Sequence, residues 1–211
     1  MTKRLSNLFR NGAYALVIFL LALPVLILFK MRVRGRDLID AGKEYIIVAH
    51  HCSYWDIPLI VVAFGIRNRI QFIAREGLKR NPIFLPLLQL FSTTIDRDNF
   101  GRRDFRRILQ MMRKERLIGI FPEGTTKAQA SAKTGVIHFA RLTRKLLLPV
   151  HIKANGPYPP RYPFGFPRVT VSIGEAVSLS SLEKEIPALP EKSSERASVL
   201  TKRLMERIDA A

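Results

Sequence analysis

One long apolar segment constrains the fold of this chain more than any other feature. Residues 13–29 (AYALVIFLLALPVLILF) carry no charge, and as a single helix they would be about 26 Å long. That length is marginal for the roughly 30 Å hydrocarbon core of a bilayer, and Pro24 interrupts the run. Basic residues flank both ends of the segment: Lys3, Arg4, Arg10, Lys30, Arg32, Arg34 and Arg36. A span that obeys the positive-inside rule usually carries most of its positive charge at one end. We expect an uncleaved membrane anchor, either a tilted span or two half-helices seated in one leaflet.

A signal peptide and a buried core helix both fit this segment less well. A signal peptide would end in a small-residue cleavage site, but the apolar run ends in FKMR. A buried core helix would not be expected to lead into so many arginines. We therefore place an anchor with basic flanks at residues 1–36 and one folded domain at residues 37–211.

Composition narrows the class of protein and its partners. The chain has 211 residues, 47% of them hydrophobic, so it can bury a real core and is not disordered. Its single cysteine, Cys52, excludes an intrachain disulfide and a multi-cysteine zinc site. The net charge of +18 points to nucleic acid, an anionic membrane surface or anionic substrates. Because of the apolar segment we expect the phospholipid membrane surface as partner and no nucleic acid.

After the anchor, short β-branched runs alternate with helical stretches. We expect strands at 45–49, 69–74, 93–96, 117–121, 146–152 and 169–173. We expect helices at 55–64, 82–91, 102–116, 135–145 and 193–208. Strands alternating with helices are typical of an α/β fold with a mainly parallel central sheet flanked by helices.

The densest group of reactive side chains follows the first of these strands, in residues 50–56 (HHCSYWD). His51 and Asp56 lie about 140° apart round a helix, so they can meet only if His51 ends a strand and Asp56 begins the next helix. Asp56 would then hold one imidazole nitrogen and leave the other to take a proton. Alternatively, Ser53 and Asp56 have the spacing of a capping box, in which Asp56 merely closes a helix start. Both roles for Asp56 stay open on these residues alone.

Three further segments occur in a recognisable order. Residues 94–97 (TIDR) end one predicted strand, residues 121–126 (FPEGTT) follow another, and Pro149 lies inside a third. With the histidine and aspartate above, these four blocks resemble the glycerolipid acyltransferase family. The resemblance runs from about residue 33 to residue 152, and it implies the same α/β fold.

The resemblance also implies a set of site residues. His51 and Asp56 match the catalytic block, and the residues implied for the acceptor and its phosphate are Arg75, Arg97, Glu123, Gly124, Thr125 and Lys127. The cations would bind phosphate. Glu123 would accept a hydrogen bond from an acceptor hydroxyl or hold the cationic groups in place. No spacing of histidines and carboxylates suggests a metal.

The chain departs from the family pattern at two positions. Many members carry arginine where this chain has Thr126, which leaves open whether Lys127 supplies that charge. His50 stands where asparagine is common, and the spacing to Asp56 favours His51 as the base.

The family's chemistry implies an enzyme that moves a fatty acyl chain from an acyl thioester to the free hydroxyl of 1-acyl-glycerol 3-phosphate, a lysophospholipid, and so forms phosphatidic acid. His51 would remove the hydroxyl proton during attack on the thioester carbonyl. We expect acyl-CoA or acyl carrier protein as co-substrate, no other cofactor, and a place at the cytoplasmic face of the cell membrane.

Other functions remain possible on the sequence. The same fold could acylate glycerol 3-phosphate, an amino-acid lipid or another lysophospholipid. It could also be a thioester hydrolase, in which water replaces the acceptor. A non-catalytic basic protein that binds membranes through charge alone is a further alternative.

Overall fold

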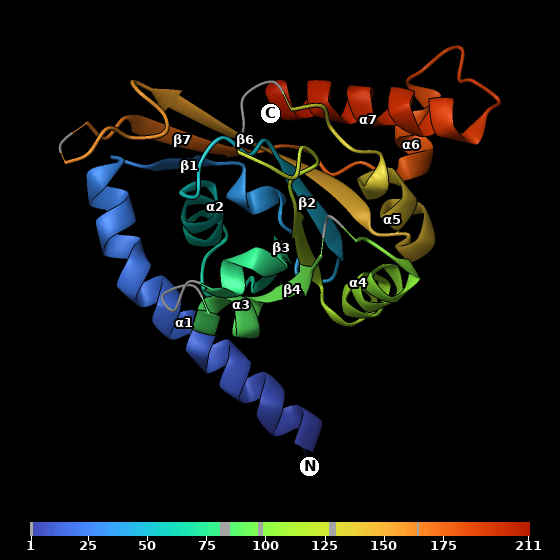
Figure 1. The fold of residues 1–211 in the computed structure, drawn as a ribbon. Helices are drawn as coiled ribbons and strands as arrows, with labels where there is room; N and C mark the ends of the chain where they lie inside the picture. The colour runs from blue at the N-terminus through green and yellow to red at the C-terminus, as the bar shows by residue number, and fades with distance from the viewer. Residues whose placement is uncertain (1, 81–84, 97–98, 127–129, 164) are drawn as a thin grey trace.

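A mostly parallel seven-stranded sheet lies at the centre of the molecule (Figure 1). The structure is a computed structural model that describes residues 2–80, 85–96, 99–126, 130–163 and 165–211. The strands are β1 (Arg32–Arg34), β2 (Tyr45–Ala49), β3 (Ile70–Arg75), β4 (Ser92–Ile95), β5 (Leu117–Ile120), β6 (Leu146–Asn155) and β7 (Arg168–Ile173). Their order in the sheet is β1-β7-β6-β2-β5-β3-β4. The β6–β7 pair is antiparallel and the other neighbouring pairs are parallel.

Helices cover both faces of the sheet. They are α1 (Thr2–Leu28), α2 (Asp56–Phe64), α3 (Leu85–Phe91), α4 (Arg102–Lys114), α5 (Gly135–Thr143), α6 (Leu179–Lys184) and α7 (Ser193–Asp209), with short 3-10 helices η1 (Arg36–Leu38) and η2 (Glu76–Arg80). Because successive side chains of a strand point to opposite faces, Tyr45 and Ile47 of β2 enter the core beneath α1, α2 and α3. Ile46 and Val48 enter the core beneath α4, α5, α6 and α7. The predicted α/β fold is confirmed.

The predicted elements are present, with small differences at their ends. All six predicted strands and all five predicted helices have counterparts within a few residues of the expected bounds. Residues 82–84 of one predicted helix lie outside the described residues. The sequence did not indicate β1 or α6, which are too short to show a periodic pattern.

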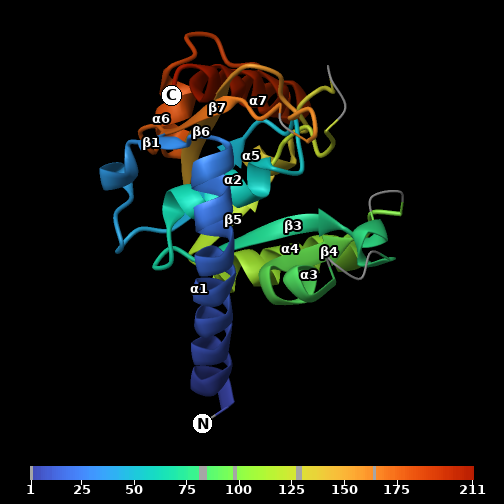
Figure 2. The same ribbon diagram turned by 90° about the vertical axis from the view of Figure 1, so that its left-hand side faces the viewer.

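The N-terminal apolar segment is one long helix. Helix α1 continues through Pro24, so it does not divide into two half-helices at that residue. Figure 2 shows α1 lying along the outside of the domain, with its N-terminal end projecting beyond it. Its inner face packs against α2 and the sheet through Tyr14, Ile18 and Val25, which are at most 5% exposed.

The region after α1 already belongs to the sheet. β1 pairs in parallel with β7, and the Arg36 side chain donates hydrogen bonds to the Val62 and Ala63 carbonyls at the end of α2. Those carbonyls have no partner within the helix, so the contact closes its C-terminal end. The division into residues 1–36 and 37–211 stays a prediction, and β1 joins the two parts.

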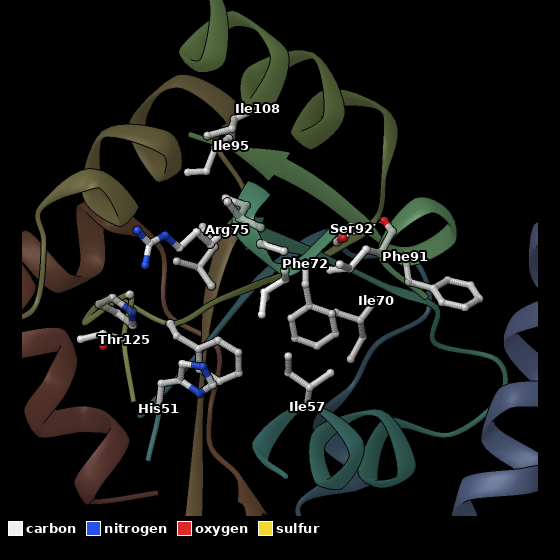
Figure 3. Close-up of a pocket in the computed structure, with 18 of the residues that line it drawn as sticks. His51, Ile57, Ile70, Phe72, Arg75, Phe91, Ser92, Ile95, Ile108 and Thr125 are labelled. Carbon is white, nitrogen blue, oxygen red and sulfur yellow. Dashed lines mark hydrogen bonds between the residues drawn. The ribbon is translucent and has the colours of Figure 1, made fainter. Parts of the chain in front are cut away.

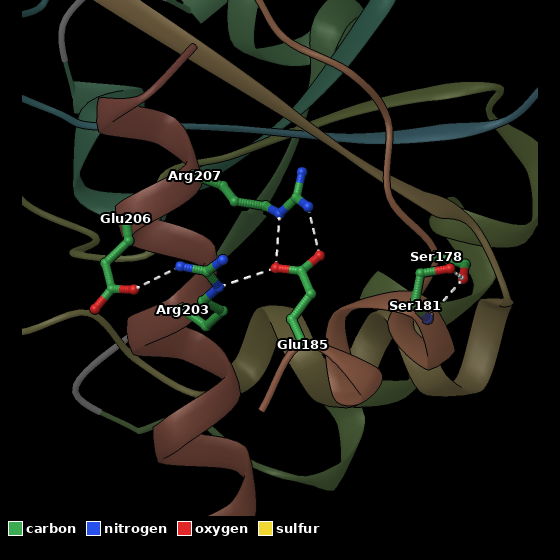
Figure 4. Close-up of polar contacts among 6 residues, drawn as sticks. All are labelled: Ser178, Ser181, Glu185, Arg203, Glu206 and Arg207. Atoms are coloured by element: carbon green, nitrogen blue, oxygen red, sulfur yellow. Dashed lines mark hydrogen bonds and ion pairs between the residues drawn. The ribbon is translucent and has the colours of Figure 1, made fainter. Parts of the chain in front are cut away.

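Helix α7 is held to α6 by ion pairs on the far side of the sheet from α1 (Figure 4). Ser178 caps α6 by accepting the Ser181 backbone N–H at 3.0 Å. Glu185, which follows α6, accepts from Arg203 Nε at 2.9 Å and from Arg207 Nε at 3.1 Å. These contacts place the end of α7 beside the loops that follow β2 and β5.

Candidate active site

A cavity of about 1390 Å³ opens beside the carboxyl ends of β2, β3 and β5. Figure 3 shows His51, Arg75 and Thr125 at one side of it, and Ile70 and Phe91 at the side nearer α1. Among the described residues, the charged and imidazole side chains in its lining are His51, Arg75, Glu76, Asp96, Lys133 and His138. Most of the remaining lining is apolar. The cavity therefore joins a polar end to a long apolar space, the shape that suits an amphipathic ligand.

His51 and Asp56 meet in the way the sequence predicts. His51 follows the end of β2 and Asp56 is the first residue of α2. His51 Nδ1 lies 2.9 Å from Asp56 Oδ2. A carboxylate can only accept here, so we assign the proton to Nδ1, which leaves Nε2 as the unprotonated nitrogen. The His51 side chain is 12% exposed and lines the cavity.

Asp56 also holds the loop that leads into α2, through the Ser53 N–H contact that forms one half of the predicted capping box. Asp56 is 1% exposed. Its Oδ2 accepts the backbone N–H of Cys52 at 2.8 Å and of Ser53 at 2.9 Å in addition to the histidine. Its Oδ1 accepts from the hydroxyl of Tyr158. A buried carboxylate with this many donors is fixed in position.

An aromatic stack holds the imidazole from the other side. The His51 ring stacks on Phe121 with centroids 4.2 Å apart, and Phe121 stacks on Phe72 at 6.1 Å. Gly119 makes room for this stack, because a Cβ there would lie 2.3 Å from the Phe72 ring. The position of the imidazole thus depends on a glycine in β5.

The segment after β5, residues 121–125, forms a tight turn beside His51. Gly124 has φ +67°, a backbone conformation that side chains disfavour, and its N–H donates to Phe121 O at 3.0 Å. Glu123 accepts from His50 Nδ1 at 2.6 Å, and His50 Nε2 lies 3.0 Å from Asp209 at the end of α7. The hydrogen bond to Glu123 raises the pKa of His50. The turn is thereby tied to the C-terminal helix.

The structure brings some of the predicted acceptor residues to the cavity and not others. Arg75, Gly124 and Thr125 line it with His51. Glu123 is outside the described lining and accepts a hydrogen bond from His50. Arg97 and Lys127 lie outside the described residues. The roles of all these residues stay predictions.

The position of Cys52 and the pKa of its thiol both argue against a role as nucleophile. It is exposed, and it is absent from the described lining of the cavity. Partial desolvation of the thiol, and the negative charges of Asp56 and Glu123, raise its pKa. Because the thiolate is the reactive form, this environment lowers its reactivity.

Two residues near the site were given no role from the sequence: Lys133, which belongs to a local match with the family, and Tyr158, which was missed. Lys133 lines the cavity, and its backbone N–H donates to Pro122 O at 3.0 Å, which fixes it beside the turn at residues 121–125. Tyr158 reaches Asp56 from 102 positions further along the chain. No local signal marks Tyr158, because it lies in a proline-rich loop between β6 and β7.

Comparisons with known proteins agree with the motifs and the fold. The profile of the family described as Acyltransferase matches residues 30–153, more than half of the chain. A Bacillus subtilis (strain 168) protein named 1-acyl-sn-glycerol-3-phosphate acyltransferase is 25% identical over 181 residues, which cover 84% of this chain and 86% of that protein.

A solved structure shares the architecture. It is the crystal structure of the 1-acyl-sn-glycerophosphate (LPA) acyltransferase PlsC from Thermotoga maritima, with a TM-score of 0.67 and 22% identity, covering 100% of this chain and 85% of that one. The four motif blocks, the extent of the family match and the shared fold lead to one conclusion: this chain belongs to the acyltransferase family.

Proposed function

We propose that this enzyme transfers a fatty acyl chain from a thioester donor to the free hydroxyl of 1-acyl-glycerol 3-phosphate and so forms phosphatidic acid. The observation that carries the proposal is the His51–Asp56 pair at the polar end of a large apolar cavity. The names of the Bacillus subtilis and Thermotoga maritima proteins support this acceptor.

The pair can act as a general base without a covalent acyl-enzyme. Nε2 of His51 takes the proton from the acceptor hydroxyl while the hydroxyl oxygen attacks the thioester carbonyl carbon. Asp56 stabilises the imidazolium that forms. When the tetrahedral intermediate collapses, the C–S bond breaks and the imidazolium returns the proton to the leaving thiolate. The base is then restored for the next turnover.

The polar end of the cavity suits the phosphate of the acceptor. Arg75, at the end of β3, supplies a guanidinium that can bind phosphate with two parallel hydrogen bonds, and Thr125 adds a hydroxyl. Arg97 and Lys127 complete the proposed set on the strength of the family resemblance. Lys133 is a further cation at this end, close to Thr126, where many relatives carry arginine.

The apolar remainder of the cavity suits an acyl chain. It is lined by Ile57, Ile70, Phe72 and Phe91, and it extends to residues of the anchor helix that include Val17 and Leu21. Because the lining includes residues of α1, a lipid can enter from the membrane side without first leaving the bilayer.

Helix α1 is the proposed membrane anchor. Residues Asn7–Leu28 have a mean hydropathy of 2.3, enough by length and composition to cross a membrane. Its outward face exposes large apolar side chains along the whole helix: Leu8, Phe9, Leu16, Phe19, Leu20, Leu23, Leu26, Ile27 and Leu28.

The contacts of α1 favour a helix that lies in one leaflet of the membrane over a helix that crosses the bilayer. Arg10, near its N-terminal end, donates to Glu115 and Gln71 of the domain, at 2.8 Å each. Phe29, just beyond its C-terminal end, packs on Trp55 with ring centroids 5.1 Å apart. A helix docked from Arg10 to its C-terminal end cannot cross the bilayer along that length unless the domain enters it. Lys30, Arg32 and Arg34 then lie near anionic headgroups, as expected at the cytoplasmic face.

The thioester donor approaches from the opposite side, over α4. Six exposed basic side chains cover this helix, and among the described residues none of them forms an ion pair: Arg102, Arg103, Arg106, Arg107, Arg113 and Lys114. Phe105 and Ile108 of the same helix line the cavity. α4 lies across the sheet from α1, so its charge faces soluble anions instead of the membrane (Figure 1). Acyl-CoA and acyl carrier protein are both polyanions that fit this face.

The donor surface is tested by charge reversal. Arg106→Glu with Arg107→Glu should raise KM for the thioester and weaken its salt dependence, while Lys184→Glu with Lys202→Glu, exposed on α6 and α7, should change neither. Equal effects of the two pairs would reject a specific role for α4.

The acceptor is tested with purified protein in detergent. It is given a long-chain acyl thioester and, in parallel, lysophosphatidic acid, glycerol 3-phosphate or lysophosphatidylcholine. We expect product from lysophosphatidic acid, and Arg75→Gln should raise KM for this acceptor far more than it lowers kcat. Product only from another acceptor would keep the mechanism and replace the acceptor, whereas release of free fatty acid without acceptor would indicate a hydrolase.

A further inference from the structure

One hydrogen bond to the Asp56 carboxylate comes from outside the four motif blocks. The Tyr158 hydroxyl donates to Asp56 Oδ1, while Oδ2 serves His51 and two backbone N–H groups. Tyr158 lies in the loop between β6 and β7, beyond residue 153, where the family match ends. The oxygen that does not face the histidine thus has a donor of its own.

We propose that Tyr158 is a positioning residue for the catalytic base: its hydroxyl fixes the Asp56 carboxylate, offsets part of its negative charge and so sets how strongly His51 holds a proton. This inference rests on the proposed role of His51 as general base. It adds a hydrogen-bond donor that the family resemblance does not include.

Tyr158 is in the right ionisation state to donate. Burial, with the nearby Asp56 carboxylate, raises the pKa of its phenol, so the hydroxyl keeps its proton at neutral pH. An ionised carboxylate can only accept, and a hydrogen bond to it is among the stronger kinds in proteins. The direction of the bond is therefore settled by chemistry.

The loop that carries Tyr158 is fixed at a second place, so its reach to Asp56 is set before substrate binds. Tyr162 accepts a hydrogen bond from Trp55 Nε1 at 2.6 Å. Phe166 packs on Phe29, with ring centroids 5.3 Å apart. Trp55 directly precedes Asp56, so both contacts hold the loop against the start of α2 and the end of the anchor.

The hydroxyl should act on the histidine through charge. A donor on Oδ1 draws electron density from the carboxylate and weakens its attraction for an imidazolium. Loss of the hydroxyl should therefore raise the pKa of His51 and also let the carboxylate turn. Among the described residues, the titratable or charged groups around the pair are His50, Cys52, Tyr54, Arg75, Glu76, Asp96, Glu123, Lys133, His138 and Tyr158. Tyr158→Phe changes only one of them.

The test compares two phenylalanine substitutions in the same loop. In Tyr158→Phe we expect the acid limb of kcat/KM against pH to move up by about half a unit to one unit. We expect kcat at the plateau to fall about threefold to tenfold, with KM for the acceptor within about twofold of the parent. Tyr162→Phe removes a hydroxyl that does not touch Asp56. Its ring still packs on Phe166, and Phe166 still holds the loop against Phe29, so the acid limb of this variant should stay where it is in the parent.

A uniform fall in rate with no movement of the limb would overturn the proposal, because a purely structural role predicts that result. Incorporation of 3-fluorotyrosine at 158, a stronger donor of nearly the same size, covers the case in which Tyr158→Phe does not fold. The 3-fluorotyrosine protein should show the acid limb of kcat/KM at lower pH than the parent. An unmoved limb, or one at higher pH, would contradict the proposal.

The inference can be separated from the proposed reaction. Titration of the His51 imidazole by NMR in detergent micelles, assigned with His51→Gln, measures its pKa without any substrate. A higher pKa in Tyr158→Phe than in the parent supports the role of Tyr158 even if lysophosphatidic acid proves to be the wrong acceptor. An unchanged pKa rejects the role even if acyl transfer is observed.

Discussion

Replacing Asp56 by asparagine should remove a charge while leaving the local geometry nearly intact. The site of Oδ2 faces two backbone N–H groups, of Cys52 and Ser53, as well as His51. An amide NH₂ group at this site would face three hydrogen-bond donors with no acceptor for its own protons. The asparagine should therefore place its oxygen at this site and its NH₂ group toward Tyr158. Nδ1 of His51 then still donates, and Nε2 is still the free nitrogen. What is lost is the negative charge.

The size of the effect follows from the separation of the charges. The 2.9 Å contact between Nδ1 and Oδ2 puts the centre of the imidazolium charge about 4 Å from the carboxylate, where two unit charges interact by about 4 kcal/mol at an effective dielectric constant near 20. That energy corresponds to roughly a thousandfold loss in kcat, within the usual contribution of a general base. The acid limb of the pH profile should also move to lower pH, since the imidazolium loses its partner.

The assay is steady-state acyl transfer across pH, with thermal melting as the check on folding. Ser53→Ala is the matched control, because it removes the hydroxyl that accepts the Trp55 N–H at 3.2 Å and contacts Tyr158 but leaves the Asp56 carboxylate in place. It should cost about 1 kcal/mol of stability and keep most of the parent activity. A folded Asp56→Asn protein that keeps more than a tenth of the parent activity would mean that Asp56 merely closes the start of α2.

Three further predictions test the surroundings of the site. Gly119→Ala puts a Cβ 2.3 Å from the Phe72 ring, so melting should show a loss of about 1–3 kcal/mol, and kcat should fall more than KM changes. Leu23→Glu, on the exposed face of α1, should release the protein from anionic vesicles in a flotation assay without unfolding it. Glu123 raises the pKa of His50 in the folded protein, so protonated His50 stabilises the fold fully below its ordinary pKa of 6.5. This stabilisation is lost as the pH rises through the higher pKa of the folded state. In His50→Asn the melting temperature should therefore depend less on pH over that range.

The sequence predicts the sheet well where strands are buried on both faces. β2 reads as the unbroken apolar run YIIVA, which alternates between two cores and so needs no polar face. β1, with the sequence RVR, has no such signal. It forms because its backbone pairs with the edge of β7. Helix α1 was expected from its apolar composition, but its exposed and buried faces depend on α2 and could not be predicted.

The candidate site divides in the same way. His51 and Asp56 lie in one short segment between a predicted strand and a predicted helix, so the sequence shows how they can meet, and the structure has them in contact. Tyr158 comes from a loop 102 positions away, and only the packing of that loop on Trp55 brings it to Asp56. The orientation of Glu123 likewise depends on His50, itself held by Asp209 at the far end of the chain.

The most direct test of the central claim is acyl transfer to lysophosphatidic acid by the parent protein and by His51→Ala. The account predicts phosphatidic acid from the parent and a loss of more than about a hundredfold in the variant, the lower end of what a general base contributes. Cys52→Ala, next to the base but outside the described lining of the cavity, should keep its activity. A folded His51→Ala protein that forms phosphatidic acid at the parent rate would contradict the mechanism.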